Sequence, residues 1–167
     1  MYEPASKISG TEAVFAHLMA NEYEHPAVAA FKTLATDAKF DRAELTITVA
    51  AENIVAAAEA AKAAGYNFLE DVTCLDWYPS EPRFRVTYHI LSHKLKSRLR
   101  LGVELGSDAA SLDSITGVWP SANFYEREVF DLFGVHFNGH PNLVRIMMPE
   151  DWNGHPLRKD YPVEGYR

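Results

Sequence analysis

The chain has 167 residues, close to the length of one domain, and 47% of them are hydrophobic and 23% charged. These fractions are typical of globular proteins and argue against wholesale disorder, collagen or a coiled coil. With 16 Lys and Arg against 23 Asp and Glu, the net charge of −7 argues against general binding of nucleic acid. The single cysteine, Cys74, cannot form an internal disulfide and favours a reducing compartment.

No stretch of the sequence is apolar enough to span a membrane. The most apolar helical stretch, 53–65, is rich in alanine and is interrupted by Glu59 and Lys62. A function at a membrane would therefore require another subunit to hold this chain there.

The N-terminal part is expected to be a loose tail with two short helices, at 11–20 and 26–36. Regular structure then begins at 45–49, where alternating apolar and polar residues predict a half-buried strand. Residues 51–64 favour a helix throughout, and Gly65 stands where a helix-ending glycine is common.

Three further strands are expected in quick succession. Residues 68–77 have an extended character, residues 84–90 alternate between apolar and polar side chains, and a third strand is expected after Ser92, from Leu95 to Leu105. The last two strands are close enough in sequence to form a hairpin.

The next helix is expected at 121–133, after a proline that pre-sets its first turn and before Gly134. Its apolar residues fall at helical spacing and are expected to form the buried stripe: Ala122, Tyr125, Val129, Leu132 and Phe133.

This order of elements predicts an α+β fold, with a mostly antiparallel sheet and helices packed on one face. We expect an N-terminal tail with short helices at 1–40, an α+β core domain at 41–134 and an extended C-terminal tail at 135–167.

The C-terminal tail loses this regularity, because Asn-Gly, His-Pro, Met-Pro and Tyr-Pro pairs mark a series of turns. It nevertheless holds many apolar side chains: Phe137, Leu143, Ile146, Met147, Met148, Trp152, Leu157 and Tyr161. Because these side chains lack a core of their own, we expect the tail to be loose in the isolated chain and covered by a partner protein.

The first candidate site is the acidic cluster of Glu126, Arg127, Glu128 and Asp131. Glu128 and Asp131 share a helix face, so their carboxylates could hold a metal ion or act as acid and base. Arg127 and Asp131 are four residues apart and could pair. The preferred interpretation is therefore a polar helix face neutralised by Arg127.

Three histidines, His136, His140 and His155, form the second candidate, a zinc site. The spacing of the first two is that of a helical metal pair, but an Asn-Gly pair and a proline forbid a regular helix there. A histidine before proline is typical of an extended turn. Metal binding is therefore not expected.

Arg158, Lys159 and Asp160 form the third candidate, which follows a His-Pro pair. Adjacent Arg and Lys side chains could clamp a phosphate or an acidic partner, but no glycine-rich loop opens a helix here. An ion pair with a neighbouring subunit is the preferred interpretation, and a solvated charge run is the alternative.

Lys94, Lys96, Arg98 and Arg100 form the fourth candidate, a basic stripe. A spacing of two places all four on one face of a strand. The stripe either docks against an acidic protein surface or is a solvated, lysine-guarded strand. Motifs of nucleophilic catalysis and nucleotide binding are missing from the sequence.

Two motifs near the C-terminus are more specific than any of these candidates. The first combines Glu126-Arg127-Glu128 and Asp131 with the Gly-His-Pro at 139–141, and the second is GHPLRKDYP at 154–162. With them, the run at 122–166 closely resembles the 30 kDa subunit family, also called the C subunit, of the proton-translocating NADH:quinone oxidoreductase, respiratory complex I. The resemblance extends more weakly upstream, but not into residues 1–40.

The resemblance implies a peripheral-arm subunit on the cytoplasmic face of the inner membrane that itself binds no cofactor and has no active site. FMN and iron–sulfur clusters would lie in partner subunits, where electrons pass from NADH to ubiquinone with proton translocation. The chain would pack against the quinone-cavity subunit and the iron–sulfur subunits, and would meet the membrane only through them. The residues expected at these contacts are Glu126, Arg127, Glu128, Asp131, His140, Arg145, Arg158, Lys159 and Asp160.

The chain departs from the family's pattern at Val144, where a basic residue or proline is usual, so that only Arg145 remains basic there. The main alternative function is the equivalent subunit of a membrane-bound, energy-converting hydrogenase or of another complex I-like oxidoreductase. A remote alternative is a free metal-dependent hydrolase that uses Glu128, Asp131, His136 and His140.

Overall fold

The computed structural model describes residues 8–20, 30–41, 44–108 and 110–165. A six-stranded sheet forms its body, in the order β1-β2-β3-β6-β5-β4. The strands are β1 (Ile8–Ser9), β2 (Ala35–Asp41), β3 (Glu44–Val49), β4 (Phe68–Asp76), β5 (Phe84–Ser92) and β6 (Ser97–Leu105). Within the described residues of this sheet, only β3 and β6 pair in parallel, so the predicted α+β fold with a mostly antiparallel sheet is confirmed.

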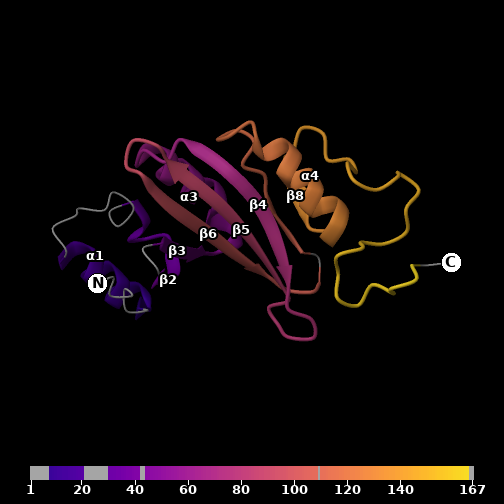
Figure 1. Cartoon of the computed structure of the whole chain (residues 1–167), viewed down its shortest axis with the longest axis horizontal. Helices are drawn as coiled ribbons and strands as arrows, with labels where there is room; N and C mark the ends of the chain where they lie inside the picture. Colours follow the sequence, from indigo (N-terminus) through magenta and orange to yellow (C-terminus); the bar gives the residue numbers. More distant parts are fainter. Residues whose placement is uncertain (1–7, 21–29, 42–43, 109, 166–167) are drawn as a thin grey trace, which may run out of the picture.

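The remaining elements lie around this sheet. They are α1 (Thr11–Ala20), the 3-10 turn η1 (Ala51–Asn53), α3 (Ile54–Ala63), α4 (Ala122–Phe133) and a second, parallel pair of short strands, β7 (Ser111–Asp113) and β8 (His136–Asn138). Figure 1 shows α1 at one end of the sheet and α4 with the C-terminal tail at the other. In the described ranges, no helix has the length and apolar character needed to cross a membrane.

One face of the sheet is apolar and carries the core. Alternate side chains of β3, β5 and β6 are buried there, namely Leu45, Ile47, Val49, Phe84, Val86, Tyr88, Ile90, Leu99, Leu101 and Val103. The alanines at 57, 58 and 61 of α3 join the same core, because a helix with small side chains can approach a sheet closely. The period-two patterns therefore identified β3 and β5 correctly.

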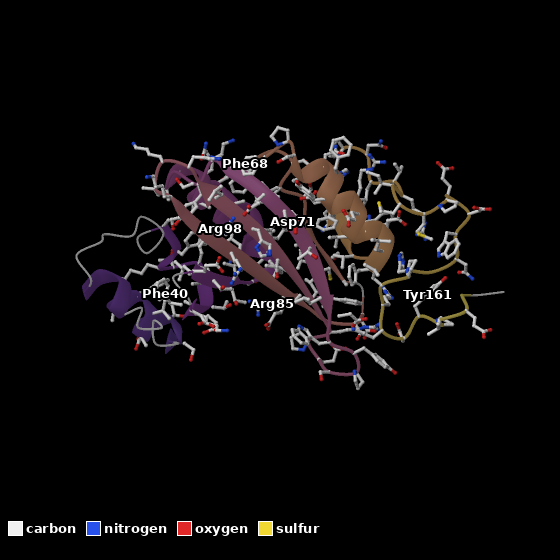
Figure 2. The ribbon with its side chains drawn as sticks, viewed as in Figure 1. Phe40, Phe68, Asp71, Arg85, Arg98 and Tyr161 are labelled. Carbon is white, nitrogen blue, oxygen red and sulfur yellow. The ribbon has the colours of Figure 1, made fainter. Side chains whose placement is uncertain are left out.

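The opposite face of the sheet is polar, and its charges pair between strands. Figure 2 labels Asp71, Arg85 and Arg98 on this face. Three ion pairs cross it: Arg98 with Glu70 at 3.2 Å, Arg85 with Glu104 at 3.1 Å, and Arg100 with Glu44.

The predicted basic stripe is wrong in its first half. Because Ser92 pairs with Ser97, β6 begins only at Ser97, and Lys94 and Lys96 lie in the turn before it. Leu95 lies in the same turn and is 40% exposed, so it is not part of the strand's buried face.

The N-terminal part contains two strands that the sequence did not predict, β1 and β2. The expectation of a loose tail is wrong at Ile8 and Ser9, because β1 pairs with β2. The helix at 11–20 is confirmed as α1. The helix expected at 26–36 is wrong at its end, because Ala35 and Thr36 belong to β2, and its first part, 26–29, lies outside the described residues. Pairing with β3 along its whole length holds β2 in the sheet, and the boundary expected after residue 40 falls within β2.

The helices predicted at 51–64 and 121–133 are confirmed as α3 and α4, but the buried side of α4 differs from the prediction. Ala122 and Val129 are buried as expected, whereas Tyr125, Leu132 and Phe133 are only partly buried. The charged residues Glu126 and Asp131 are fully buried instead.

The start of the C-terminal tail is part of the core. β8 pairs with β7, and Val135 and Phe137 are 0% and 1% exposed. The expectation that Phe137 lacks a core within the chain is therefore wrong, because its side chain belongs to the buried hydrophobic core.

Candidate partner-docking surface

The end of α4 organises the rest of the C-terminal tail, residues 139–165, which we call the C-terminal segment. Four groups of the segment donate to carbonyls of the last helical turn: Arg145 Nη1 to Asp131 at 3.2 Å, His155 Nδ1 to Asp131 at 2.9 Å, the Leu157 N–H to Leu132 at 3.0 Å and Arg158 Nε to Phe133 at 2.6 Å. The last carbonyls of a helix lack partners within it and carry the negative end of its dipole. Arg145 and Arg158 therefore supply hydrogen-bond donors to these carbonyls and also place positive charge at the negative end of the helix dipole.

The buried carboxylate of Asp131 binds the segment directly. Its Oδ1 accepts from Arg145 Nη1 at 2.5 Å, and its Oδ2 accepts the backbone N–H groups of Ile146, Met147 and Met148 at 2.9, 2.7 and 2.9 Å. Burial alone would raise the pKa of Asp131, but these three N–H donors and Arg145 lower it below the ordinary value. Asp131 is therefore held as a carboxylate inside a concavity of backbone donors.

Arg145 joins this concavity to the next turn of the segment. Its Nη2 donates to the carbonyls of Trp152 and Gly154, each at 3.1 Å. One guanidinium therefore connects α4 with two places in the segment.

Another arginine, the buried Arg83, ties the segment to the end of β4. It donates to Asp76 at 2.9 and 2.8 Å and to Asp160 at 3.1 and 2.7 Å. The Asp76 carboxylate also accepts the N–H groups of Tyr78 and Lys159, at 2.9 and 2.8 Å. Burial would raise the pKa of Asp76, but Arg83 and the two N–H donors outweigh it and lower that pKa to about 2.

Phe84 lies close to both of the arginines that hold this end of the segment. The Arg83 and Arg158 guanidinium carbons lie 4.8 and 5.1 Å from the centre of its ring. These distances are within the range of cation–π attraction, which adds to the ion pairs.

Gly134 allows the segment to pack this closely against α4. Its φ is +74°, and a Cβ at this position would lie 2.5 Å from His155 Nε2 and 2.6 Å from Arg158 Nη2. We expect Gly134→Ala to lower the free energy of unfolding by about 2–3 kcal/mol, because backbone strain and a clash add up.

Gly139 provides the matched control for this prediction. Its φ is +72°, but no described atom lies within 4 Å of its would-be Cβ. Gly139→Ala should therefore cost only the strain, about 1 kcal/mol, in urea unfolding. Equal losses in the two variants would contradict the packing role of Gly134.

Held in this way, the segment exposes apolar side chains. Beside the end of β4 lies an open groove of about 550 Å³, lined by Cys74, Leu75, Asp76, Trp77, Tyr78, Phe133, Leu157 and Lys159, which we call the apolar groove. Leu75, Trp77, Tyr78 and Leu157 are each about half exposed in it. Farther along the segment, Met147 is 61% and Trp152 is 39% exposed. Such exposed apolar groups are typical of protein interfaces.

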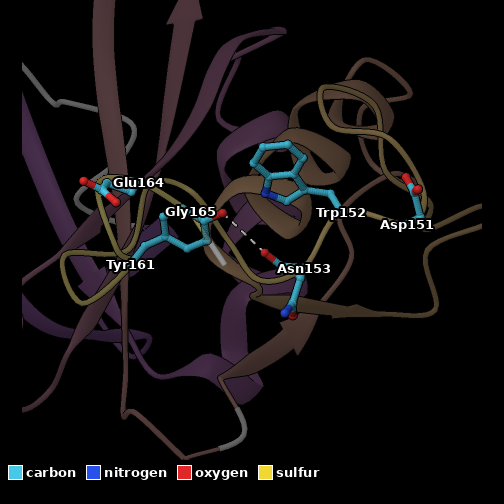
Figure 3. Close-up of a pocket in the computed structure, with 6 residues that line it drawn as sticks. All are labelled: Asp151, Trp152, Asn153, Tyr161, Glu164 and Gly165. Carbon is cyan, nitrogen blue, oxygen red and sulfur yellow. Dashed lines mark hydrogen bonds between the residues drawn. The ribbon is translucent and has the colours of Figure 1, made fainter. Parts of the chain in front are cut away.

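A smaller pocket of about 260 Å³ lies within the segment itself. It is lined by Asp151, Trp152, Asn153, Tyr161, Glu164 and Gly165 (Figure 3). The Tyr161 hydroxyl donates to the Asn153 carbonyl at 3.4 Å and links the two sides of this pocket (Figure 3). This hydrogen bond therefore closes a turn between residues eight positions apart in the segment.

Most of the residues expected to contact partners bind within the chain. The side chains of Glu126, Asp131 and His140 are fully buried, whereas Glu128 and Lys159 are exposed and Asp160 is 42% exposed. Whether any of them touches a partner stays a prediction.

Arg127 does not pair with Asp131, so that expectation is wrong. It donates instead to the carbonyls of Val144 and Arg145, at 3.1 and 3.3 Å, while Arg145 takes the place beside Asp131. The Val144 side chain is 41% exposed. At this departure from the family's pattern, the backbone of Val144 therefore still binds α4.

The three histidines of the candidate zinc site each bond to a different part of the chain. His136 is exposed and bonds to Asn138, His140 is buried with Nε2 at 3.1 Å from the Asn123 carbonyl, and His155 bonds to the end of α4. Burial lowers the pKa of His155, and the cations Arg158 and Arg145 lower it further. In the described part of the chain, no group of three His, Cys, Asp or Glu side chains is arranged to hold a metal ion.

Reasoning from sequence missed Arg83 and gave no role to Asp76. Neither residue belongs to a local motif, because the chain brings Asp160 to them from 77 positions away. The burial of Glu126, in contrast, was visible in the sequence. It stands four residues after Ala122 and three before Val129, both on the buried stripe.

Known proteins match this chain over most of its length. A family model described as the 30 kDa subunit of respiratory-chain NADH dehydrogenase matches residues 47–167. The C subunit of NADH-quinone oxidoreductase from Citrifermentans bemidjiense is 49% identical over 125 residues, covering 74% of this chain and 78% of that protein. The corresponding protein of Roseiflexus sp. is 47% identical over 125 residues, covering 73% and 72%.

Two solved structures share the fold. A trypsin-resistant fragment (1–134) of Nqo5 is 37% identical, with a TM-score of 0.56, and covers 60% of this chain and 83% of that one. A chain of the membrane-bound sulfane sulfur reductase, an archaeal respiratory membrane complex, is 25% identical, with a TM-score of 0.65, and covers 91% and 85%. The likeness to the second structure covers almost the whole chain.

Proposed function

Because this chain belongs to the family of the 30 kDa subunit of respiratory-chain NADH dehydrogenase, we propose that it is the corresponding subunit of an NADH–quinone oxidoreductase. Its part there is to dock and hold neighbouring subunits, and it has no active site of its own. The observation that carries this proposal is the C-terminal segment, which buried charges fasten to α4 and which turns its apolar side chains outward.

The residues expected at partner contacts then divide into two groups. Asp131, Arg145 and Arg158 hold the segment in place, His140 holds its first turn on α4, and Glu126 binds Ser114 and Ile115. Glu128, Lys159 and the apolar groove are open to a partner. Loss of a holding residue therefore affects docking indirectly, through the shape of the segment.

Cofactors, partners and location follow from membership of such a complex. FMN and iron–sulfur clusters lie in other subunits, and electrons pass there from NADH to a quinone with proton translocation. The partners are the quinone-cavity subunit and the iron–sulfur subunits, at the cytoplasmic face of the inner membrane.

A complex I-like enzyme with another electron donor or acceptor is the second candidate. The 91% coverage by a chain of a sulfane sulfur reductase favours it, but the identity is only 25%. Relatives named as NADH-quinone oxidoreductase subunits reach 49%, which places the NADH-linked form first.

Affinity purification of the tagged chain from solubilised source membranes tests the proposal. We expect mass spectrometry to find flavin, iron–sulfur and membrane subunits together with it. A donor module other than the flavin subunits would favour the second candidate. Recovery of the chain alone, under conditions that keep other membrane complexes intact, would contradict both.

Leu157→Glu tests the apolar groove as the docking surface. Leu157 is 50% exposed, and a carboxylate there would be desolvated on docking. We expect at least tenfold weaker recovery of the partners with an unchanged melting temperature, since about 1–2 kcal/mol is typical for a central interface residue. Phe68→Glu, at the opposite end of β4 and 46% exposed, is the control. Equal recovery with both variants would place the docking surface elsewhere.

A further inference from the structure

A buried acid and a buried histidine lie together where the C-terminal segment begins. Glu126 of α4 and His140 have fully buried side chains, and Glu126 Oε2 lies 4.0 Å from His140 Nε2. Directly beside them is an open pocket of about 490 Å³, lined by Ser114, Thr116, Gly117, Pro120, Asn123, Asn138, Gly139 and Pro141. The pair therefore lies just beneath an open surface depression.

Two hydroxyl groups connect Glu126 with this pocket. Ser114 Oγ is 2.6 Å from Glu126 Oε2 and 2.9 Å from Thr116 Oγ1, and both hydroxyl residues line the pocket. The other carboxyl oxygen, Oε1, accepts the Ile115 N–H at 2.8 Å. A proton can thus pass between the carboxyl group and water through a short chain of hydrogen bonds.

One ring nitrogen of His140 accepts a hydrogen bond and the other donates one. The Asn142 N–H donates to Nδ1 at 3.0 Å, so Nδ1 carries a lone pair. Nε2 therefore carries the proton, and it donates to the Asn123 carbonyl at 3.1 Å. This N–H has a second acceptor within reach of a small movement, the Glu126 carboxylate.

Few charges face Glu126 from the elements around it. In the described ranges, His140 is the only basic side chain within 4.0 Å of its carboxylate. Tyr88 of β5 and Cys74 of β4 are buried nearby, and burial raises the pKa of Tyr88 well above 10 and that of Cys74 to about 12. Burial also raises the pKa of Glu126 to about 7, although the Ser114 and Ile115 donors oppose this. Neither Tyr88 nor Cys74 competes for the proton near neutral pH.

We infer that Glu126 is a proton-exchange site whose charge selects the hydrogen-bond partner of His140. In the neutral state, the Glu126 hydroxyl donates to Ser114, Ser114 donates to Thr116, and His140 donates to the Asn123 carbonyl. On deprotonation, each hydroxyl passes its proton one step toward the pocket, and Thr116 releases one proton to water. The new carboxylate then draws the His140 Nε2–H away from Asn123.

This exchange links the proton to the shape of the chain. Residues 139 and 141 line the pocket on either side of His140, and Asn123 lines it from α4. When His140 turns toward Glu126, the Gly139–Pro141 turn moves inward and the Asn123 carbonyl loses its partner. The start of the C-terminal segment therefore responds to pH near neutrality.

An NMR titration of the full chain from pH 5 to 9 tests this inference. We expect the side-chain carboxyl carbon of Glu126 and the Nε2 of His140 to change together, with a midpoint near pH 7. Ser114→Ala should raise that midpoint, because it removes a donor that favours the carboxylate. Glu128→Gln, an exposed acid on the same helix, should leave both signals unchanged.

Two results would overturn the inference. One is a Glu126 midpoint below pH 5.5 in the wild type, which is decisive even where a variant fails to fold. The other is a His140 change with the same midpoint in Glu126→Gln.

Equilibrium unfolding measured as a function of pH gives an independent test of the raised pKa of Glu126. A carboxyl with its pKa raised from 4.5 to about 7 in the folded state stabilises the fold fully below pH 4.5 and loses this contribution as pH rises to 7. Relative to Glu126→Gln, the folding constant of the wild type should therefore fall about 300-fold across this window. If the folding constants of the wild type and Glu126→Gln changed with pH in the same way, Glu126 would not carry a proton in the folded chain near pH 7.

Discussion

Asp131→Ala is expected to release the C-terminal segment from α4 while the sheet stays folded. The substitution leaves three backbone N–H groups and the Arg145 guanidinium without the carboxylate that holds them. Removing one partner of a buried ion pair typically costs about 3–5 kcal/mol. Amide hydrogen exchange in residues 145–158 should accelerate by roughly a hundredfold or more, since each 1.4 kcal/mol corresponds to a factor of ten.

The matched control is Glu128→Ala, which removes an exposed carboxylate from the same helix. We expect it to leave exchange in residues 145–158 unchanged. In Asp131→Ala, exchange in β5 and β6 should remain slow, because Asp131 lies outside the packing of the sheet. Wild-type exchange rates in the segment would show that the Asp131 bonds do not hold it, and unfolding of the whole chain would show that they hold more than the segment.

Sequence periodicity identified the parts of the fold that follow local rules. β3 and β5 alternate because one side chain in two enters the core, and α3 and α4 end at glycines that take left-handed angles. β2 was missed because its residues, Ala-Thr-Asp-Ala-Lys-Phe-Asp, have little preference for strands. It becomes a strand through pairing with β3, which is a tertiary effect.

The candidate site was only partly predictable for a similar reason. The motifs singled out Asp131, Arg145, Arg158 and Asp160, and the structure places all four where the segment meets the body of the chain. Their direct bonding partners were not predictable, since Arg83 and Asp160 are 77 positions apart. That the tail is loose in the isolated chain stays a prediction, which rests on its apolar content and does not include these bonds.

In the C-terminal part, buried charged residues and exposed apolar residues have different roles. A buried charge needs a partner within the chain, and a docking surface needs side chains that remain open. In this chain the charges lie beneath the segment and the apolar side chains Met147, Trp152 and Leu157 lie outside it. Affinity for a partner is therefore expected to follow the apolar residues, and its dependence on the charges to be indirect.

Arg83→Met is expected to have the second large effect, because Arg83 lies between two carboxylates. It is 6% exposed, and its loss leaves Asp76 buried without a cation. We expect the free energy of unfolding to fall by about 3–5 kcal/mol in urea. Asp160→Asn is the contrast, since the Asp160 side chain is 42% exposed and its ion pair should be worth about 1 kcal/mol or less.

The pH dependence of stability distinguishes this ion-pair role from simple loss of packing. Because the pKa of Asp76 is lowered from 3.8 to about 2 in the folded chain, its contribution is present above pH 3.8 and is lost as pH falls toward 2. That loss amounts to about 2 kcal/mol in the wild type. In Arg83→Met the Asp76 pKa rises, so this acid-dependent loss should shrink or vanish. An unchanged acid limb, together with a large loss of stability at pH 7, would mean that Arg83 acts through packing on Phe84 rather than through its charge.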